Sequence, residues 1–77
     1  MPRLPLISGK KLIAVLSKLG YGVVRQRGSH IRLCTSDISA RKPLTVPDYR
    51  LIDRSLLKKI LRDAKLTTAE FIKLLKK

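Results

Sequence analysis

Apolar residues near the N-terminus recur with the period of an α-helix. They fall at positions i, i+3, i+4 and i+7, and they are Leu12, Val15, Leu16 and Leu19. This spacing places them on one helical face. Ser8 is a favoured N-cap residue, and Gly20 can take the left-handed conformation that ends a helix. The pattern therefore predicts a helix over residues 9–19.

After this helix the pattern changes to the alternation of β-strands. Residues 21–26 and 29–34 are rich in β-branched and aromatic side chains, and Arg27-Gly28 separates them. Two such runs joined by two residues predict a β-hairpin with Gly28 as the structural turn residue. In this register Arg25 lies opposite His30.

Because successive side chains in a strand point to opposite faces, the register assigns each residue of the hairpin to one face. The inner, apolar face comprises Gly22, Val24, Ile31 and Leu33. The outer face comprises Tyr21, Val23, Arg25, His30 and Arg32. A shift of one residue would bury charged side chains, so the register is well determined.

The remaining pattern completes an α-β-β-β-α-α order. A polar loop is expected over residues 35–43, a short third strand over residues 44–46, a helix over residues 54–65, and a short last helix packing Phe71, Leu74 and Leu75. Asp53 is expected to cap the first of these helices, and Thr67 with Glu70 forms a capping box for the last. We therefore predict one α+β domain over residues 1–77, a three-stranded antiparallel sheet with its helices on one face.

Composition points to a polyanionic partner. The chain has 18 Lys and Arg against five Asp and Glu, a net charge of +13, and no acidic residue precedes Asp37. Such a field attracts nucleic acid or an anionic membrane. A membrane is less favoured because the helices need their apolar faces for the core, and no apolar run approaches the ~20 residues of a span. A single cysteine and the lack of a secretory signal predict a cytoplasmic protein.

The turn region carries a resemblance to a known family. Arg25-Gln26-Arg27-Gly28-Ser29-His30 resembles the Arg-Gln-x-Gly-Ser-His segment of HicA-type mRNA interferase toxins. Further matches lie along most of the chain, at Ser8-Gly9-Lys10, Thr45-Val46-Pro47, Ile60-Leu61 and Ala64. Three departures stand out. Ser55-Leu56-Leu57 stands where Gly-Thr-Leu commonly opens the second helix of family members. Asp48 and Tyr49 follow Pro47 where family members often carry a histidine, and Lys65 replaces the glycine of an Ala-Gly pair.

The resemblance implies a fold like that of double-stranded-RNA-binding domains. It also implies a toxin-type endoribonuclease that acts on mRNA without metal or other cofactor, with its catalytic histidine at His30. A cognate HicB-type acidic antitoxin is implied as a partner that blocks the active face.

The residue types around the histidine suit this chemistry. Metal-free RNA cleavage uses the 2′-hydroxyl of the substrate as nucleophile, so the protein moves protons with imidazole and stabilises charge with arginine. His30 is the expected general acid/base. RNA contacts are expected from Arg25, Arg27, Arg32, Lys10, Lys11, Ser29 and Tyr21. Water, a lysine or Tyr21 could serve the opposite proton transfer. One histidine and one cysteine are too few for a zinc site, so no metal is expected.

A second hypothesis needs no catalysis. His30 would then be a solvated surface residue, and the protein would bind double-stranded RNA through basic side chains and shape alone.

The net charge generates a prediction about salt. If about five phosphates of single-stranded RNA are neutralised, the logarithm of the affinity should fall with the logarithm of salt concentration at a slope near −3.5. Titrations from low to moderate salt measure this slope. An affinity that does not change with salt would contradict the polyanion hypothesis.

Overall fold

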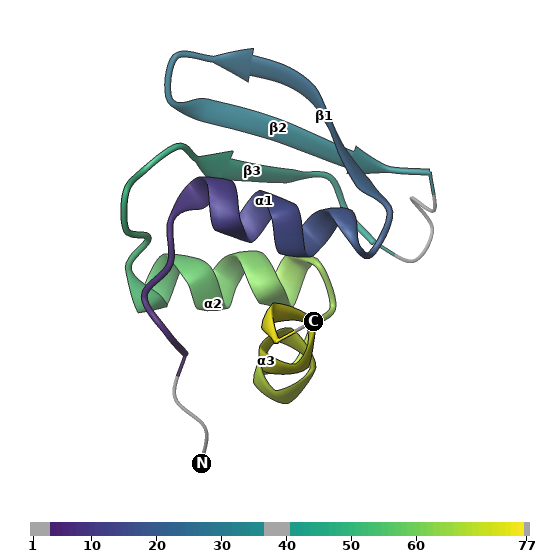
Figure 1. Cartoon of the computed structure of the whole chain (residues 1–77). Helices are drawn as coiled ribbons and strands as arrows, with labels where there is room; N and C mark the ends of the chain where they lie inside the picture. The colour runs from purple at the N-terminus through teal and green to yellow at the C-terminus, as the bar shows by residue number, and fades with distance from the viewer. Residues whose placement is uncertain (1–3, 37–40, 77) are drawn as a thin grey trace.

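The computed structural model describes residues 4–36 and 41–76. Its elements are α1 (Gly9–Ser17), β1 (Tyr21–Arg27), β2 (His30–Thr35), β3 (Leu44–Pro47), α2 (Arg54–Asp63) and α3 (Thr68–Leu75). The strands form one antiparallel sheet in the order β1-β2-β3, and α2 lies beside β3 on the side away from β1 (Figure 1). The predicted α+β order is confirmed. Of the loop expected over residues 35–43, residues 37–40 lie outside the described part.

Each helix begins at the cap that the sequence predicts. The side chains of Ser8 and Asp53 accept the backbone N–H three residues further on, at 3.1 and 2.7 Å. Thr67 and Glu70 exchange two hydrogen bonds of 2.9 and 3.1 Å, which is a complete capping box. The Thr67 backbone N–H stabilises the Glu70 carboxylate and so lowers its pKa. Asp53 and Glu70 are therefore capping groups.

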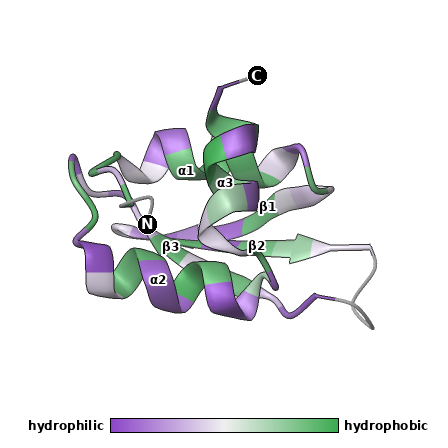
Figure 2. Ribbon diagram, turned by 90° about the horizontal axis from the view of Figure 1, so that it is seen from below, coloured by the Kyte–Doolittle hydropathy of each residue, from purple (hydrophilic) through white to green (hydrophobic). Residues whose placement is uncertain are grey.

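The hydrophobic core lies between the helices and the inner face of the sheet. α2 carries hydrophobic and hydrophilic residues in alternating bands, as an amphipathic helix must (Figure 2). The largest fully buried side chains come from both layers and include Phe71, Leu12, Leu16, Leu33, Ile52, Leu57 and Val46. Among the helices of the described residues, none is long and apolar enough to cross a membrane.

The hairpin turn lies one residue later than predicted. Gly28 and Ser29 connect the strands, and Gly28 has a φ of +56°. A positive φ at the first turn residue suits glycine, as in a type II′ hairpin turn. As a result Arg27 pairs with His30 and Arg25 pairs with Arg32, so the predicted pairing of Arg25 with His30 is wrong.

A β-bulge at Val24 confines the shifted register to the part of the hairpin next to the turn. Val23 still pairs with Leu33, and the register changes between Val23 and Arg25. The extra residue reverses the alternation of faces along β1. Tyr21 therefore points into the core while Arg25 points to the outer face.

Val24 is 61% exposed, so its predicted burial is wrong. β1 is the edge strand farthest from α2 (Figure 1), and Tyr21 is its only buried residue. Because the helices do not cover β1 beyond this point, Val23 is exposed as well, at 54%. The alternation of residue types alone did not reveal that most of this strand lies outside the core.

The end of α2 has a left-handed residue that is not glycine. Lys65 has a φ of +58°. Its N–H binds the carbonyl of Arg62 at 3.1 Å, and the N–H of Leu66 binds the carbonyl of Leu61 at 2.9 Å. These two bonds define a Schellman motif, whose left-handed position normally holds glycine.

This conformation generates a prediction about stability. Replacing Lys65 with Gly removes the Cβ that makes the left-handed backbone unfavourable, so the free energy of unfolding should rise by about 0.5–1 kcal/mol. Urea denaturation measures the change. Lys65→Ala is the matched control, because it removes the same charge but keeps the Cβ. An equal gain in both variants would show that charge rather than backbone conformation is responsible.

Candidate active site

The outer face of the hairpin gathers four cationic or titratable side chains. The pairs Arg27 with His30 and Arg25 with Arg32 lie on adjacent strands, and directly paired residues share a face. Together with Thr45 of β3 they line a hollow of about 210 Å³. The sequence placed His30, Arg25 and Arg32 on this face, whereas Arg27, expected in the turn, joins them only because the turn lies one residue later.

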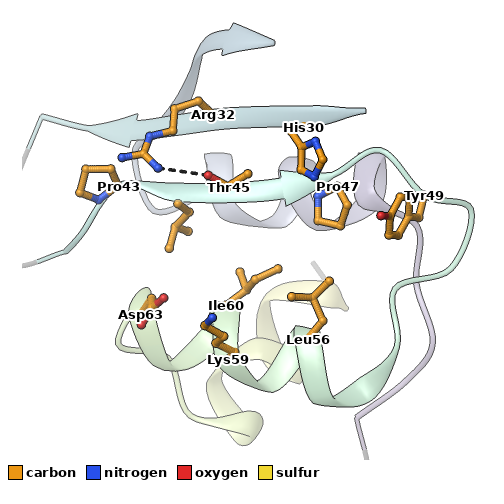
Figure 3. A pocket seen from close by; sticks show the side chains of 11 residues that line it. His30, Arg32, Pro43, Thr45, Pro47, Tyr49, Leu56, Lys59, Ile60 and Asp63 are labelled. Atoms are coloured by element: carbon orange, nitrogen blue, oxygen red, sulfur yellow. Dashed lines mark hydrogen bonds between the residues drawn. The ribbon is translucent and has the colours of Figure 1, made fainter. Parts of the chain in front are cut away.

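Among the residues that the structure describes, little opposes the positive charge of this hollow. Arg32 donates a hydrogen bond of 3.1 Å from Nη1 to Thr45 Oγ1, a neutral acceptor (Figure 3). Within the described chain, none of the residues lining the hollow is acidic. Like charges opposite one another across strands are destabilising, so the arrangement favours an anionic ligand such as phosphate.

His30 also borders a second, larger hollow between β3 and α2. This groove has a volume of about 370 Å³, and its lining mixes apolar residues such as Pro47, Leu56 and Ile60 with polar and charged ones. Tyr49 lies beside Pro47 at the end of the groove near His30, whereas Lys59 and Asp63 project from α2 (Figure 3). His30 therefore borders both a cationic surface and a groove whose lining is partly apolar.

Backbone contacts fix the chain around His30. Pro47 is the pairing partner of His30 across β2 and β3. The N–H of Asp48 donates to the Ser29 carbonyl at 2.6 Å, and the N–H of Gly9 donates to the Tyr49 carbonyl at 2.9 Å. The start of α1, the hairpin turn and the end of β3 thus meet at the histidine. Ser29 contributes its backbone carbonyl here.

Four of the side chains predicted to contact RNA line neither hollow, namely those of Tyr21, Lys10, Lys11 and Ser29. Tyr21 is buried, and its hydroxyl donates to the Lys42 carbonyl at 2.7 Å. Burial raises the pKa of this hydroxyl. The prediction that Tyr21 shares the outer face with His30, and could exchange a proton there, is wrong because the bulge turns it inward. Lys10 and Lys11 are exposed on the first turn of α1 and line neither hollow.

Sequence reasoning missed the residues of the groove that come from α2 and from the segment after β3. Tyr49, Leu56, Lys59 and Asp63 were not expected near His30. Of these residues, only Tyr49 could have been placed near the site from the sequence, because it follows Pro47 by two residues. Of the His, Cys, Asp and Glu side chains that the structure describes, no three form a group able to hold a metal ion.

Comparison with known proteins identifies a family that the chain matches. A family model described as "HicA toxin of bacterial toxin-antitoxin" matches residues 9–66. This range contains every residue that lines the two hollows beside His30. Neither the curated proteins nor the solved structures include a match to the chain.

The contact between α1 and β3 generates a prediction. A Cβ at Gly9 would overlap the carbonyl oxygen of Pro47, so either the helix start or the end of β3 must move. Gly9→Ala should therefore lower the free energy of unfolding by about 1–3 kcal/mol in urea denaturation. Gly22→Ala is the matched control, since a Cβ there meets no atom within 4 Å. If both variants are as stable as the wild type, the close approach of Gly9 to Pro47 does not contribute to the free energy of unfolding.

Proposed function

Because this chain belongs to the HicA toxin family of bacterial toxin–antitoxin systems, we propose that it is a toxin-type endoribonuclease that cleaves mRNA without a metal ion. The observation that carries the proposal is the position of its one histidine. His30 is exposed beside three arginines, at the edge of a groove large enough for part of a nucleotide. Phosphate and an acid–base group would meet there.

The proposed reaction uses the ribose of the substrate as nucleophile. The 2′-oxygen loses its proton and attacks the adjacent phosphorus. The bond from phosphorus to the 5′-oxygen breaks, the leaving oxygen takes a proton, and a 2′,3′-cyclic phosphate remains. His30 serves one of these two proton transfers, a role worth about 10²–10⁴-fold in rate. Water or Lys59, which lines the same groove, serves the other.

The arginines stabilise the charge that the phosphate develops. Arg25, Arg27 and Arg32 line one hollow with His30, so a phosphate bound by them lies within reach of the imidazole. Guanidinium groups suit this role because they stay protonated and bind phosphate oxygens in a bidentate manner. Lys10 and Lys11, on the first turn of α1, add to the long-range attraction of RNA.

The family implies an antitoxin partner. We propose that this partner is an acidic, HicB-type protein that covers the His30 face. A net charge of +13 would steer such a protein to the toxin, and their association would be fast and sensitive to salt. The same arginines would then bind carboxylates in the complex and phosphates in the free toxin.

A non-catalytic RNA binder is the second candidate. The observation that favours it is a further cationic surface on α2, where Lys58, Lys59 and Arg62 are exposed. Basic side chains on two faces would suffice to bind double-stranded RNA by shape. Under this hypothesis His30 has no role in chemistry.

Replacing His30 with Ala separates the two candidates. The variant loses its only imidazole but keeps all 18 Lys and Arg residues. An exposed substitution of this kind should change the free energy of unfolding by no more than about 0.5 kcal/mol. We expect His30→Ala to fold and bind RNA, and neither to cleave it in vitro nor to arrest growth. Denaturation, RNA binding, cleavage and growth assays measure these properties.

Arginine variants, and wild-type protein in the presence of a chelator, are compared with His30→Ala. Arg25→Ala and Arg32→Ala should weaken binding and cleavage together, because these side chains contact the substrate in both ground and transition states. Wild-type cleavage should persist in excess chelator. Equal cleavage by wild type and His30→Ala would make His30 an ordinary surface residue. Wild-type protein that binds RNA and never cuts it would favour the non-catalytic binder.

A further inference from the structure

We infer that the ring of Tyr49 stacks against an unpaired base of the RNA, next to the phosphate at His30, and so restricts the substrate to single-stranded segments. The inference rests on the proposed function and names the substrate class of that site. It assigns a role to a residue that the catalytic chemistry does not use.

The position of Tyr49 suits contact with a nucleotide bound at His30. Its side chain is 48% exposed and lines the groove of about 370 Å³ that His30 also borders. In Figure 3 the ring lies beside Pro47, at the same end of the groove as His30 and Leu56. A nucleotide whose phosphate is at His30 would carry its base toward this ring.

The backbone of Tyr49 is fixed before any ligand arrives. Its carbonyl accepts the Gly9 N–H at 2.9 Å, and the preceding residue, Asp48, donates to the Ser29 carbonyl at 2.6 Å. The ring is therefore attached to a segment held by both α1 and the hairpin turn. Because the backbone of this segment is already ordered, less conformational freedom is lost on binding, which favours the use of the ring as a ligand contact.

The groove has apolar and charged parts, which match the apolar base and the anionic phosphate of a nucleotide. Pro47, Leu56 and Ile60 give it apolar walls, and His30, Arg32 and Lys59 line it as well. The acidic residue of the lining, Asp63, lies on α2 at the end of the groove away from Tyr49 (Figure 3). A base has apolar faces, whereas its phosphate is anionic, so the base fits the walls and the phosphate fits the charged rim. Its volume lies at the lower end of about 300–1,000 Å³ for small-ligand sites.

Stacking on Tyr49 requires a base with a free face. In a duplex both faces of each base are covered by neighbouring pairs, whereas unpaired bases stack readily on aromatic side chains. Tyr49 would therefore contribute to the binding of single-stranded RNA and contribute nothing to the binding of a paired duplex. The cationic hollow of Arg25, Arg27 and Arg32 would attract either form through phosphate.

The experiment measures binding in the His30→Ala background, so that no substrate is cut. The probes are a short single-stranded oligoribonucleotide and a fully paired duplex of the same sequence. The chain has two tyrosines and no tryptophan, and Tyr21 is buried, so intrinsic fluorescence can report stacking on Tyr49. We expect the single strand to quench this fluorescence and the duplex to leave it nearly unchanged.

Three variants identify what the ring contributes. Tyr49→Leu should weaken single-strand binding by about 5- to 100-fold, the usual contribution of one stacked base, and leave duplex binding unchanged. Tyr49→Phe should retain the single-strand affinity, since its ring has the same faces. Leu51→Ala is the matched control, because Leu51 is 59% exposed in the same segment and lines neither hollow. It should bind both probes as the parent does.

Three outcomes would overturn the inference. If Tyr49→Phe loses as much affinity as Tyr49→Leu, the hydroxyl is what matters. If Tyr49→Leu weakens single strand and duplex equally, its effect is not stacking. If Tyr49→Leu weakens the binding of neither probe, the ring does not contact RNA and has another role, such as contact with a protein. None of these results depends on cleavage, so failure of the wild type to cut RNA would count against the proposed function alone.

Discussion

The close approach of Gly9 to Pro47 is the constraint on which the surroundings of His30 depend. Only a residue without a side chain lets α1 begin against the Pro47 carbonyl. From there the Gly9 N–H reaches the carbonyl of Tyr49, and Pro47 pairs with His30 on β2. Backbone packing thus places the histidine and the aromatic ring relative to each other, which is the kind of rigid support that a functional site requires.

Alternation along β2 allows one strand to serve both the core and the site. Ile31 and Leu33 are buried under the helices, whereas His30 and Arg32 stand on the opposite face. The cations on that face repel one another and do not stabilise the fold. Burial on the inner face offsets this repulsion, and a bound polyanion would relieve it. The positive charge on the outer face of β2 is therefore better explained by the binding of an anionic ligand than by a contribution to fold stability.

The bulge at Val24 and the turn at Gly28 act together. The turn brings Arg27 opposite His30, and the bulge then returns Tyr21 to the core. Without the bulge, the face of β1 that carries Arg25 and Arg27 would also carry Tyr21. The cost is the exposure of Val23 and Val24 on an edge strand. The hairpin has thereby gained a third arginine on the face that carries the histidine.

The sequence by itself determined the order of elements, the three helix caps and the alternation of β2. Caps depend on atoms within about four residues of one another, and the faces of β2 follow from its period of two. Ser8, Asp53 and Thr67 could therefore be assigned without a structure, and so could the outward position of His30. What only the tertiary structure decided was the bulge, the burial of Tyr21, the exposure of Val24, and the groove that joins His30 to Tyr49, Lys59 and Asp63. These features depend on where the helices stop covering β1 and on the packing of α2 beside β3, and both are set by contacts between residues far apart in the chain.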